Sequence, residues 1–219
     1  MTPPESVQAM LADIAAHARE AADFTRHPQI SPRVLEAMAR VPREAFVPEG
    51  LRGRAYWDSP LPIGEGQTIS QPFIVALMTD LVRPHPRARV LDVGTGSGYQ
   101  AAVLAELVDR VHSLEVVPRL AREAGERLRD LGYGNVETRA GDGRRGWPEA
   151  APFDGIVVAA AADEVPGALV EQLRPGGRLV IPVKGGPYAQ NLLLIEKGDD
   201  GGLDVREVLP VAFVPLVGG

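Results

Sequence analysis

The sequence predicts an α/β fold with a mostly parallel, doubly wound β-sheet, antiparallel C-terminal strands and an N-terminal helical cap. Three observations favour this fold. From residue 88 onward, short apolar segments rich in β-branched residues alternate with segments of helical periodicity. This alternation is typical of a parallel sheet with helices on both faces. A glycine-rich turn joins the first strand to a helix, and the tail carries two extended segments around a Gly- and Asp-rich turn.

The N-terminal part of the chain is predicted to form three helices and one long loop. Apolar residues recur at helical spacing over residues 5–24. Ser31 matches a helix N-cap, because proline follows it in the first helical position. Residues 46–66 have weak periodicity and many Gly and Pro residues, so we expect mostly loop. Loops of this length are usually functional. A third helix is expected from Gln71 onward.

The alternating part of the chain is predicted to build the sheet. Each strand is short and apolar, and each helix carries its apolar residues on one face. We expect strands at 89–93, 111–116, 136–140, 153–158 and 178–183, helices from 100, at 118–131 and at 164–173, and antiparallel strands at 190–197 and 203–214. The acidic pair Asp163-Glu164 is interpreted as the start of the last helix.

Composition excludes several classes of protein. The 219 residues suit a single domain over 1–219. The chain has no cysteine, which rules out disulfides and thiolate catalysis. Its net charge of −6 argues against a nucleic-acid binder. No apolar run approaches the about 20 residues that cross a membrane, and no signal peptide is evident, so we expect a cytoplasmic protein with no membrane contact.

The glycine-rich turn points to the ligand. It reads Asp92-Val-Gly94-Thr-Gly96-Ser-Gly98-Tyr99 between a strand and a helix. A dinucleotide fingerprint needs glycine where Tyr99 stands, and a phosphate loop needs a lysine that is missing. The remaining acidic G-x-G-x-G pattern resembles motif I of S-adenosylmethionine-dependent methyltransferases, which have a Rossmann-like fold. The alternative is a turn with no ligand.

Two further carboxylates follow the ends of neighbouring predicted strands, where ligands bind in open α/β sheets. Glu115 lies about 20 residues beyond the first glycine, where a carboxylate commonly accepts ribose hydroxyls. Asp142, in Gly141-Asp142-Gly143, is placed to accept a hydrogen bond from an adenine amino group. The alternatives are a solvated carboxylate for Glu115 and an ordinary Asp-Gly turn for Asp142.

Other catalytic patterns are missing from the sequence. The four histidines show no metal spacing, and no G-x-S-x-G elbow occurs, so no metal site is expected. Ser70 precedes the helix that begins after Gln71, and by spacing alone its hydroxyl is interpreted as a helix N-cap.

A more specific signal runs over residues 56–72, YWDSPLPIGEGQTISQP. This stretch resembles the signature of protein-L-isoaspartate (D-aspartate) O-methyltransferases. The resemblance extends along nearly the whole chain. Blocks similar to the family occur at 34–38, 41–47, 92–100, 141–143, 152–154, 172–177 and 213–217. One departure lies after the fifth predicted strand, where Lys184 replaces the family's usual glycine, and its cation either shifts that turn or touches the substrate carboxylate.

The resemblance implies methyl transfer from S-adenosylmethionine to the α-carboxylate of L-isoaspartyl residues in damaged proteins, with D-aspartyl residues as a second class of substrate. The ester then converts through a succinimide, and S-adenosylhomocysteine is the other product. The implied partners are isoaspartyl-containing proteins, with the enzyme acting as a monomer. Residues 1–82 would supply the helices and active-site loop, and residues 83–219 the cofactor-binding core.

The resemblance also implies the site residues. It implies Ser70 as the active-site residue. The implied cofactor positions are Asp92, Gly94, Gly96, Gly98, Glu115, Asp142 and Gly143. The implied substrate positions are Ile63, Gln67, Thr68, Ile69 and Val214, with the backbone of 214–217 closing the site.

This chemistry needs no strong general base, because a carboxylate with a pKa of about 4 is already ionised at neutral pH. The protein's task is positioning, which can supply about 7–11 kcal/mol of the barrier. We expect Ser70 to donate a hydrogen bond to the carboxylate, and the 58–66 loop to close over the peptide. One alternative is a methyltransferase that esterifies normal aspartate in a biosynthetic peptide. Another is a non-catalytic S-adenosylmethionine-binding module.

Overall fold

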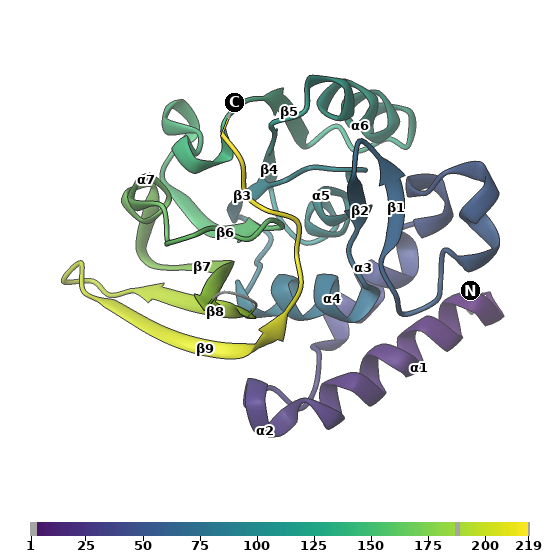
Figure 1. The fold of residues 1–219 in the computed structure, drawn as a ribbon, viewed down its shortest axis with the longest axis horizontal. Coiled ribbons are helices and arrows are strands. Elements are labelled where there is room, and N and C mark those ends of the chain that lie inside the picture. Colours follow the sequence, from purple (N-terminus) through teal and green to yellow (C-terminus); the bar gives the residue numbers. More distant parts are fainter. Residues whose placement is uncertain (1–3, 187–188, 219) are drawn as a thin grey trace.

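The computed structural model describes residues 4–186 and 189–218. Helices come first along the chain, and strands and helices then alternate (Figure 1). The helices are α1 Glu5–Glu20, α2 Ala22–Thr25, α3 Pro32–Arg40, α4 Pro72–Leu81, α5 Tyr99–Ala105, α6 Pro118–Asp130 and α7 Gly167–Glu171, with short 3-10 helices η1 Arg43–Phe46, η2 Glu49–Arg54, η3 Gly143–Arg145 and η4 Pro148–Ala150. The strands are β1 Leu61–Gly64, β2 Gln67–Ile69, β3 Arg89–Val93, β4 Arg110–Glu115, β5 Val136–Ala140, β6 Phe153–Val158, β7 Leu173–Gly186, β8 Ala189–Lys197 and β9 Leu203–Val211.

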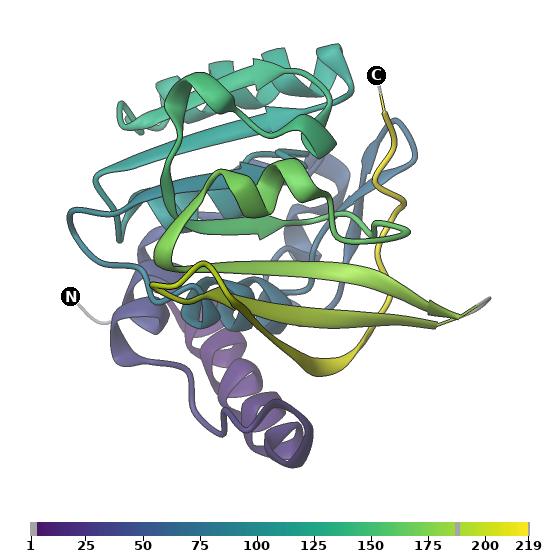
Figure 2. The ribbon, with the colours of Figure 1, turned by 90° about the vertical axis from the view of Figure 1, so that its left-hand side faces the viewer.

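The main sheet, within the described residues, has the strand order β5-β4-β3-β6-β7-β8-β9. The pairs from β5 to β7 are parallel, and the pairs β7-β8 and β8-β9 are antiparallel (Figures 1 and 2). The chain enters the sheet at β3, runs outward to β5, and returns to β6 on the other side of β3. The strand order therefore reverses between β3 and β6, where open α/β sheets bind ligands. The predicted α/β fold with an antiparallel tail is confirmed.

Both faces of the sheet are covered, which explains why its central strands β3 and β6 are buried along almost their whole length. Val90 and Leu91 are neighbours in β3 but belong to separate cores, because successive side chains of a strand point to opposite faces. The larger core packs the N-terminal helices α1, α3 and α4 together with α5 against one face. The smaller core lies on the other face and includes Trp147 and Leu169 of α7. The predicted helical cap is thus part of the main core.

The segment predicted as loop over residues 46–66 is more regular than its composition indicates. It contains η2, and β1 pairs with β2 as an antiparallel hairpin apart from the main sheet (Figure 1). The backbone turns between them at Gly64, Glu65 and Gly66, all with positive φ. The loop prediction was wrong here, because strands of four and three residues are too short to show an alternating pattern.

Three element boundaries also differ from the prediction. The helix expected at 164–173 is limited to α7, because Pro166 disfavours helical backbone at the residue before it. Asp163-Glu164 therefore does not start a helix. The first helix breaks at Ala21 into α1 and α2. Strand β7 begins at Leu173, which pairs with Phe153 of β6. Within the described residues, no helix combines the length and the apolar character that a membrane span needs.

Candidate active site

A cavity lies at the carboxyl ends of β3 and β4, beside the reversal of strand order. Its floor is the glycine turn over residues 93–97 together with Glu115 and Gly143. Two segments from other parts of the chain line it as well: residues 67–70, which end the hairpin, and residues 214–217 of the C-terminal segment. Figure 1 shows this segment, in yellow, running from β9 across the sheet toward β5.

The glycine turn needs glycine for its backbone. Gly94, Gly96 and Gly98 have φ values of +93°, +52° and +93°, a region that other residues adopt only with strain. Gly94 and Gly96 line the cavity. A Cβ on Gly96 would lie 3.3 Å from Cδ1 of Ile63, so the hairpin packs directly on the turn. Gly98 lies outside the cavity lining and instead begins α5 against Leu128 of α6.

Glu115 lies at the end of β4, and its carboxylate faces the glycine turn. Its side chain is buried, and it accepts hydrogen bonds from the backbone N–H of Gly96 at 2.8 Å and of Val117 at 3.0 Å. A carboxylate has about four acceptor positions, so two bonds leave capacity for hydroxyl donors of a ligand. The residue lines the cavity where sequence reasoning expected it.

Asp92 is fully buried beneath the glycine turn and is outside the cavity lining. Its Oδ2 accepts a hydrogen bond from the Ser113 hydroxyl at 2.7 Å, and Ser113 also bonds Thr95 at 2.6 Å. Within the described part of the chain, Oδ1 has no hydrogen-bond partner. Burial raises the pKa of Asp92 to about 7, against the lowering effect of the Ser113 bond. This carboxyl group therefore keeps its proton to a higher pH than an exposed aspartate does.

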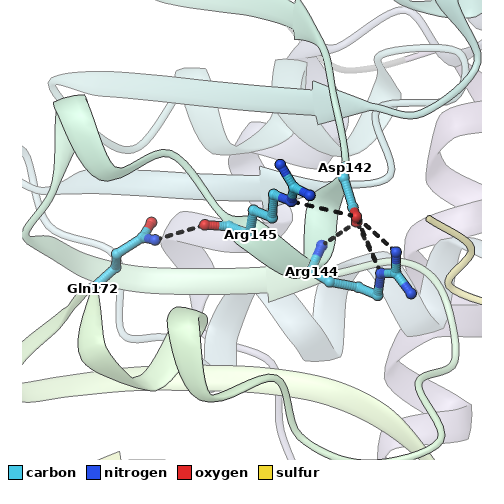
Figure 3. Close-up of polar contacts among 4 residues, drawn as sticks. All are labelled: Asp142, Arg144, Arg145 and Gln172. Atoms are coloured by element: carbon cyan, nitrogen blue, oxygen red, sulfur yellow. Dashed lines mark hydrogen bonds and ion pairs between the residues drawn. The ribbon is translucent and has the colours of Figure 1, made fainter. Parts of the chain in front are cut away.

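Asp142 is occupied by contacts within the protein. Its carboxylate accepts a hydrogen bond from the backbone N–H of Arg144 at 3.0 Å and pairs with the Arg144 guanidinium at 2.7 Å (Figure 3). The guanidinium of Arg145 approaches to 3.9 Å, while the Arg145 carbonyl accepts from Gln172. The bond from Arg144 lowers the pKa of Asp142. Asp142 does not line the cavity, whereas Gly143 does, and the predicted adenine contact stays a prediction.

A second cavity adjoins the first on the side of the N-terminal helices. Its volume is about 580 Å³, within the range of ligand pockets in proteins. Its wall is formed mostly by Phe73 and Ile74 of α4 and by residues 209–214. The two cavities share Thr68, Ser70, Ala159 and Val214. We call this second cavity the groove.

Ser70 stands at the junction of the two cavities. Among the described residues, its hydroxyl has no hydrogen-bond partner, and the N-cap of α4 is Gln71. The backbone N–H of Phe73 in the first turn of α4 donates to Asp58 at 2.7 Å. The N-cap interpretation of Ser70 was therefore wrong, because a carboxylate from the preceding loop stabilises this helix end.

Arg43 positions the Ser70 backbone and was missed by sequence reasoning. It is fully buried, and its guanidinium donates to the Ser70 carbonyl at 2.8 Å and to the Ala55 carbonyl at 2.7 Å. The guanidinium also stacks 4.6 Å from the centre of the Tyr99 ring. Burial lowers the pKa of Arg43. The sequence signal that could have indicated its burial is its position between the apolar residues Val41 and Phe46.

The other predicted site residues fall into two groups. Gln67, Thr68, Ile69 and Val214 line the first cavity, whereas Ile63 lines neither cavity. Lys184 lines neither cavity, and its ammonium pairs with Asp163. The predicted contact of Lys184 with a substrate carboxylate therefore has no support from its position.

The arrangement joins two cavities at Ser70, so ligands bound in both would meet there. In the first cavity, the glycine turn lets the backbone lie close to a ligand, and the carboxylate of Glu115 has free acceptor positions. Both features suit a nucleoside-containing cofactor. At Gly143 a Cβ would lie 2.3 Å from Cγ1 of Val93, so only glycine fits at this edge of the cavity. The groove is mostly apolar with few polar groups, which suits an organic or peptide ligand.

Comparison with known proteins identifies close relatives. The family profile described as protein-L-isoaspartate(D-aspartate) O-methyltransferase (PCMT) matches residues 24–219. Protein-L-isoaspartate O-methyltransferase 2 of Syntrophobacter fumaroxidans is 55% identical over 210 residues, with coverage of 96% of this chain and 85% of that protein. A protein of the same name from Polaromonas sp. is 53% identical over 209 residues, which cover 95% of this chain and 99% of that protein.

Two solved structures agree with the fold. One, described as a protein-L-isoaspartate O-methyltransferase, has a TM-score of 0.82 at 29% identity, and the match covers 95% of this chain but 66% of that one. The other, from Plasmodium falciparum and in complex with S-adenosyl-L-homocysteine, is described as a putative protein-L-isoaspartate O-methyltransferase. Its TM-score is 0.75 at 27% identity, with coverage of 93% of this chain and 99% of that one.

Proposed function

This chain belongs to the protein-L-isoaspartate(D-aspartate) O-methyltransferase family, and we propose that it repairs damaged proteins by methylating the α-carboxylate of their L-isoaspartyl residues. D-Aspartyl residues are the second substrate class in this proposal. The methyl ester then passes through a succinimide. The observation that carries the proposal is the free hydroxyl of Ser70 at the junction of a cofactor-type cavity and a largely apolar groove.

We assign the first cavity to S-adenosylmethionine, with S-adenosylhomocysteine as the product. When bound, this cofactor supplies a methyl group on a sulfonium centre. The turn at Gly94 and Gly96 lets the ligand approach the backbone, and Glu115 accepts hydrogen bonds from ribose hydroxyls. Gly143 lines the cavity and packs closely against Val93, where a Cβ would clash. Asp92 and Gly98 do not line the cavity. Asp92 is buried beneath the turn and bonded to Ser113, and Gly98 joins the turn to α5.

We assign the groove to the isoaspartyl peptide. Ser70 donates a hydrogen bond from its hydroxyl to one oxygen of the substrate α-carboxylate, and the other oxygen is left to attack. This carboxylate is already ionised at neutral pH, so Ser70 orients it and no base has to remove a proton. Arg43 fixes the backbone of Ser70 through the carbonyl bond at 2.8 Å, which limits movement of the hydroxyl.

Exclusion of water is the task of the segments over the junction. Thr68 and Val214 line both cavities, and Ile69 and residues 215–217 extend the cover over the first. Backbone hydrogen bonds hold the C-terminal segment at this place: the Ala161 N–H donates to the Val214 carbonyl at 2.8 Å, and the Leu216 N–H donates to the Ala161 carbonyl at 2.7 Å. Such a cover strengthens electrostatic contacts inside the site.

Methyl transfer to two synthetic peptides, identical except for aspartate or isoaspartate at one position, tests the proposed activity. We expect a base-labile methyl ester on the isoaspartyl peptide alone. Ester on the normal peptide would favour the tailoring of biosynthetic peptides. Cofactor binding without ester on either peptide would favour a non-catalytic binding module.

The role of Ser70 is tested by Ser70→Ala. A hydrogen bond to a charged group contributes about 1.5–3 kcal/mol, so kcat should fall about 10- to 100-fold while binding of S-adenosylhomocysteine stays constant. Ser31→Ala is the matched control, because the Ser31 hydroxyl makes no capping bond at the start of α3. An unchanged kcat in Ser70→Ala would remove Ser70 from the catalytic machinery.

A further inference from the structure

His17 lies in the wall of the groove, although it belongs to α1 near the N-terminus. The family profile begins at residue 24, so α1 lies outside the matched region. The His17 ring packs 5.7 Å from the ring of Phe73, and both side chains line the groove together with Ser70. Helix α1 also contributes Met10 and Ile14 to the main core. The imidazole is therefore carried by a firmly packed helix.

The imidazole lies against Asp58. Nδ1 of His17 is buried and lies 2.5 Å from Oδ2 of Asp58, a close polar contact without the geometry of a hydrogen bond. The Asp58 side chain is only 4% exposed, and it is held in turn by the Gln71 amide at 2.8 Å and the Phe73 N–H at 2.7 Å. The imidazole is thus tied to the loop that precedes Ser70 and to the first turn of α4.

The opposite edge of the imidazole is open to the groove. The side chain is 42% exposed while Nδ1 is buried, so the exposed part is the edge that carries Nε2. Among the described residues, Nε2 has no partner. The other polar side chains of the groove are Thr68 and Ser70 at the junction and Gln71, whose amide already bonds Asp58. His17 is therefore the polar group available in the wall away from Ser70.

We propose that His17 binds the backbone of the isoaspartyl peptide beside the modified residue. The inference rests on the proposed function, which assigns the groove to this peptide. An extended peptide presents N–H and C=O groups, and Nε2 can accept a hydrogen bond from the first or donate one to the second. A few placed polar groups in an apolar pocket commonly fix the orientation of a ligand. Helix α1 thus supplies a substrate-binding residue to the site.

The test compares His17→Phe with the wild-type enzyme on a long isoaspartyl peptide and on a short blocked isoaspartyl substrate without flanking residues. For the long peptide, KM should rise about 3- to 10-fold, as expected for one hydrogen bond, while kcat stays within about twofold. For the short substrate, KM should not change. His17→Gln, which keeps a polar group at the end of the side chain, should recover part of the loss.

Two controls separate binding from folding. His85→Phe alters a histidine that faces Asp154 at 3.5 Å and lines neither cavity, so it should leave both substrates unaffected. Binding of S-adenosylhomocysteine should be equal in all variants. Equal KM values in His17→Phe and wild type, or an equal rise for both substrates, would overturn the role of His17.

If the proposed function is wrong, the assays give a different result from the one expected if only the role of His17 is wrong. The wild-type enzyme would then methylate neither substrate. Binding of the long peptide in the presence of S-adenosylhomocysteine, measured by calorimetry, still decides the role of His17. Binding weakened by His17→Phe would support that role, and binding that is absent or unchanged would contradict it.

Discussion

Asp92→Asn is predicted to change how the stability of the protein depends on pH. The carboxyl group is fully buried, and burial raises its pKa from 3.8 to about 7. Between these values the folded protein holds a proton that the unfolded chain has released. Its contribution to stability is therefore complete below about pH 4 and is lost as the pH rises through about 7.

The size of the effect follows from the pKa. At 1.36 kcal/mol for each pKa unit, the whole loss is about 4 kcal/mol, of which about 3 kcal/mol falls between pH 5 and pH 8.5. The amide that replaces the carboxyl group would stay neutral throughout this range. The free energy of unfolding of Asp92→Asn, relative to the wild type, should therefore rise by about 3 kcal/mol over the same interval.

Urea unfolding of the wild type and of Asp92→Asn without cofactor, at about pH 5 and about pH 8.5, measures this difference in the free energy of unfolding. Tryptophan fluorescence reports the fraction unfolded. The slope of free energy against urea should be the same for both proteins. Ser113→Ala serves as a second variant. Loss of its hydrogen bond should raise the pKa of Asp92 further, so this variant should lose stability at a higher pH than the wild type does. A stability difference between Asp92→Asn and wild type that does not vary with pH would refute the reasoning.

Three further variants test other parts of the site. Arg43→Met should lower the free energy of unfolding by about 2–6 kcal/mol, because it leaves the Ala55 and Ser70 carbonyls without their charged donor; a urea midpoint close to wild type would contradict this. Glu115→Gln should raise the Kd of S-adenosylhomocysteine about 10-fold or more, because an amide replaces one acceptor oxygen; calorimetry that shows equal affinity would exclude a ribose contact. Gly98→Ala should cost about 1–3 kcal/mol, because φ is +93° and the new Cβ would lie 3.2 Å from Leu128; an unchanged Tm would count against strain in this turn.

Most of the sheet could be predicted from local patterns. The predicted strands at 89–93, 136–140 and 153–158 agree with β3, β5 and β6 at both ends. The central strands β3 and β6 are buried along almost their whole length and rich in apolar residues, and this signal lies within a few residues of chain. The hairpin of β1 and β2 was missed because its strands are too short to carry a pattern and depend on each other for pairing.

Part of the candidate site could be predicted for the same reason. Gly94, Gly96 and Glu115 follow strand ends, and the ends of neighbouring parallel strands meet at one edge of the sheet. The prediction for Asp142 depended on the direction of its side chain, which Arg144 decides. Lys184 likewise pairs with Asp163, a partner 21 residues away that no local pattern indicates.

The sequence by itself determined the alternation of strands and helices, the glycine turn with its carboxylate at Glu115, and the family signature around Ser70. These features depend on the conformational preferences and spacing of nearby residues. Only the tertiary structure decided that Asp58 stabilises the start of α4, that Arg43 holds the Ser70 backbone, and that His17 faces the groove. Each of these contacts joins groups far apart in the chain, and buried polar groups find partners according to the packing of the whole fold.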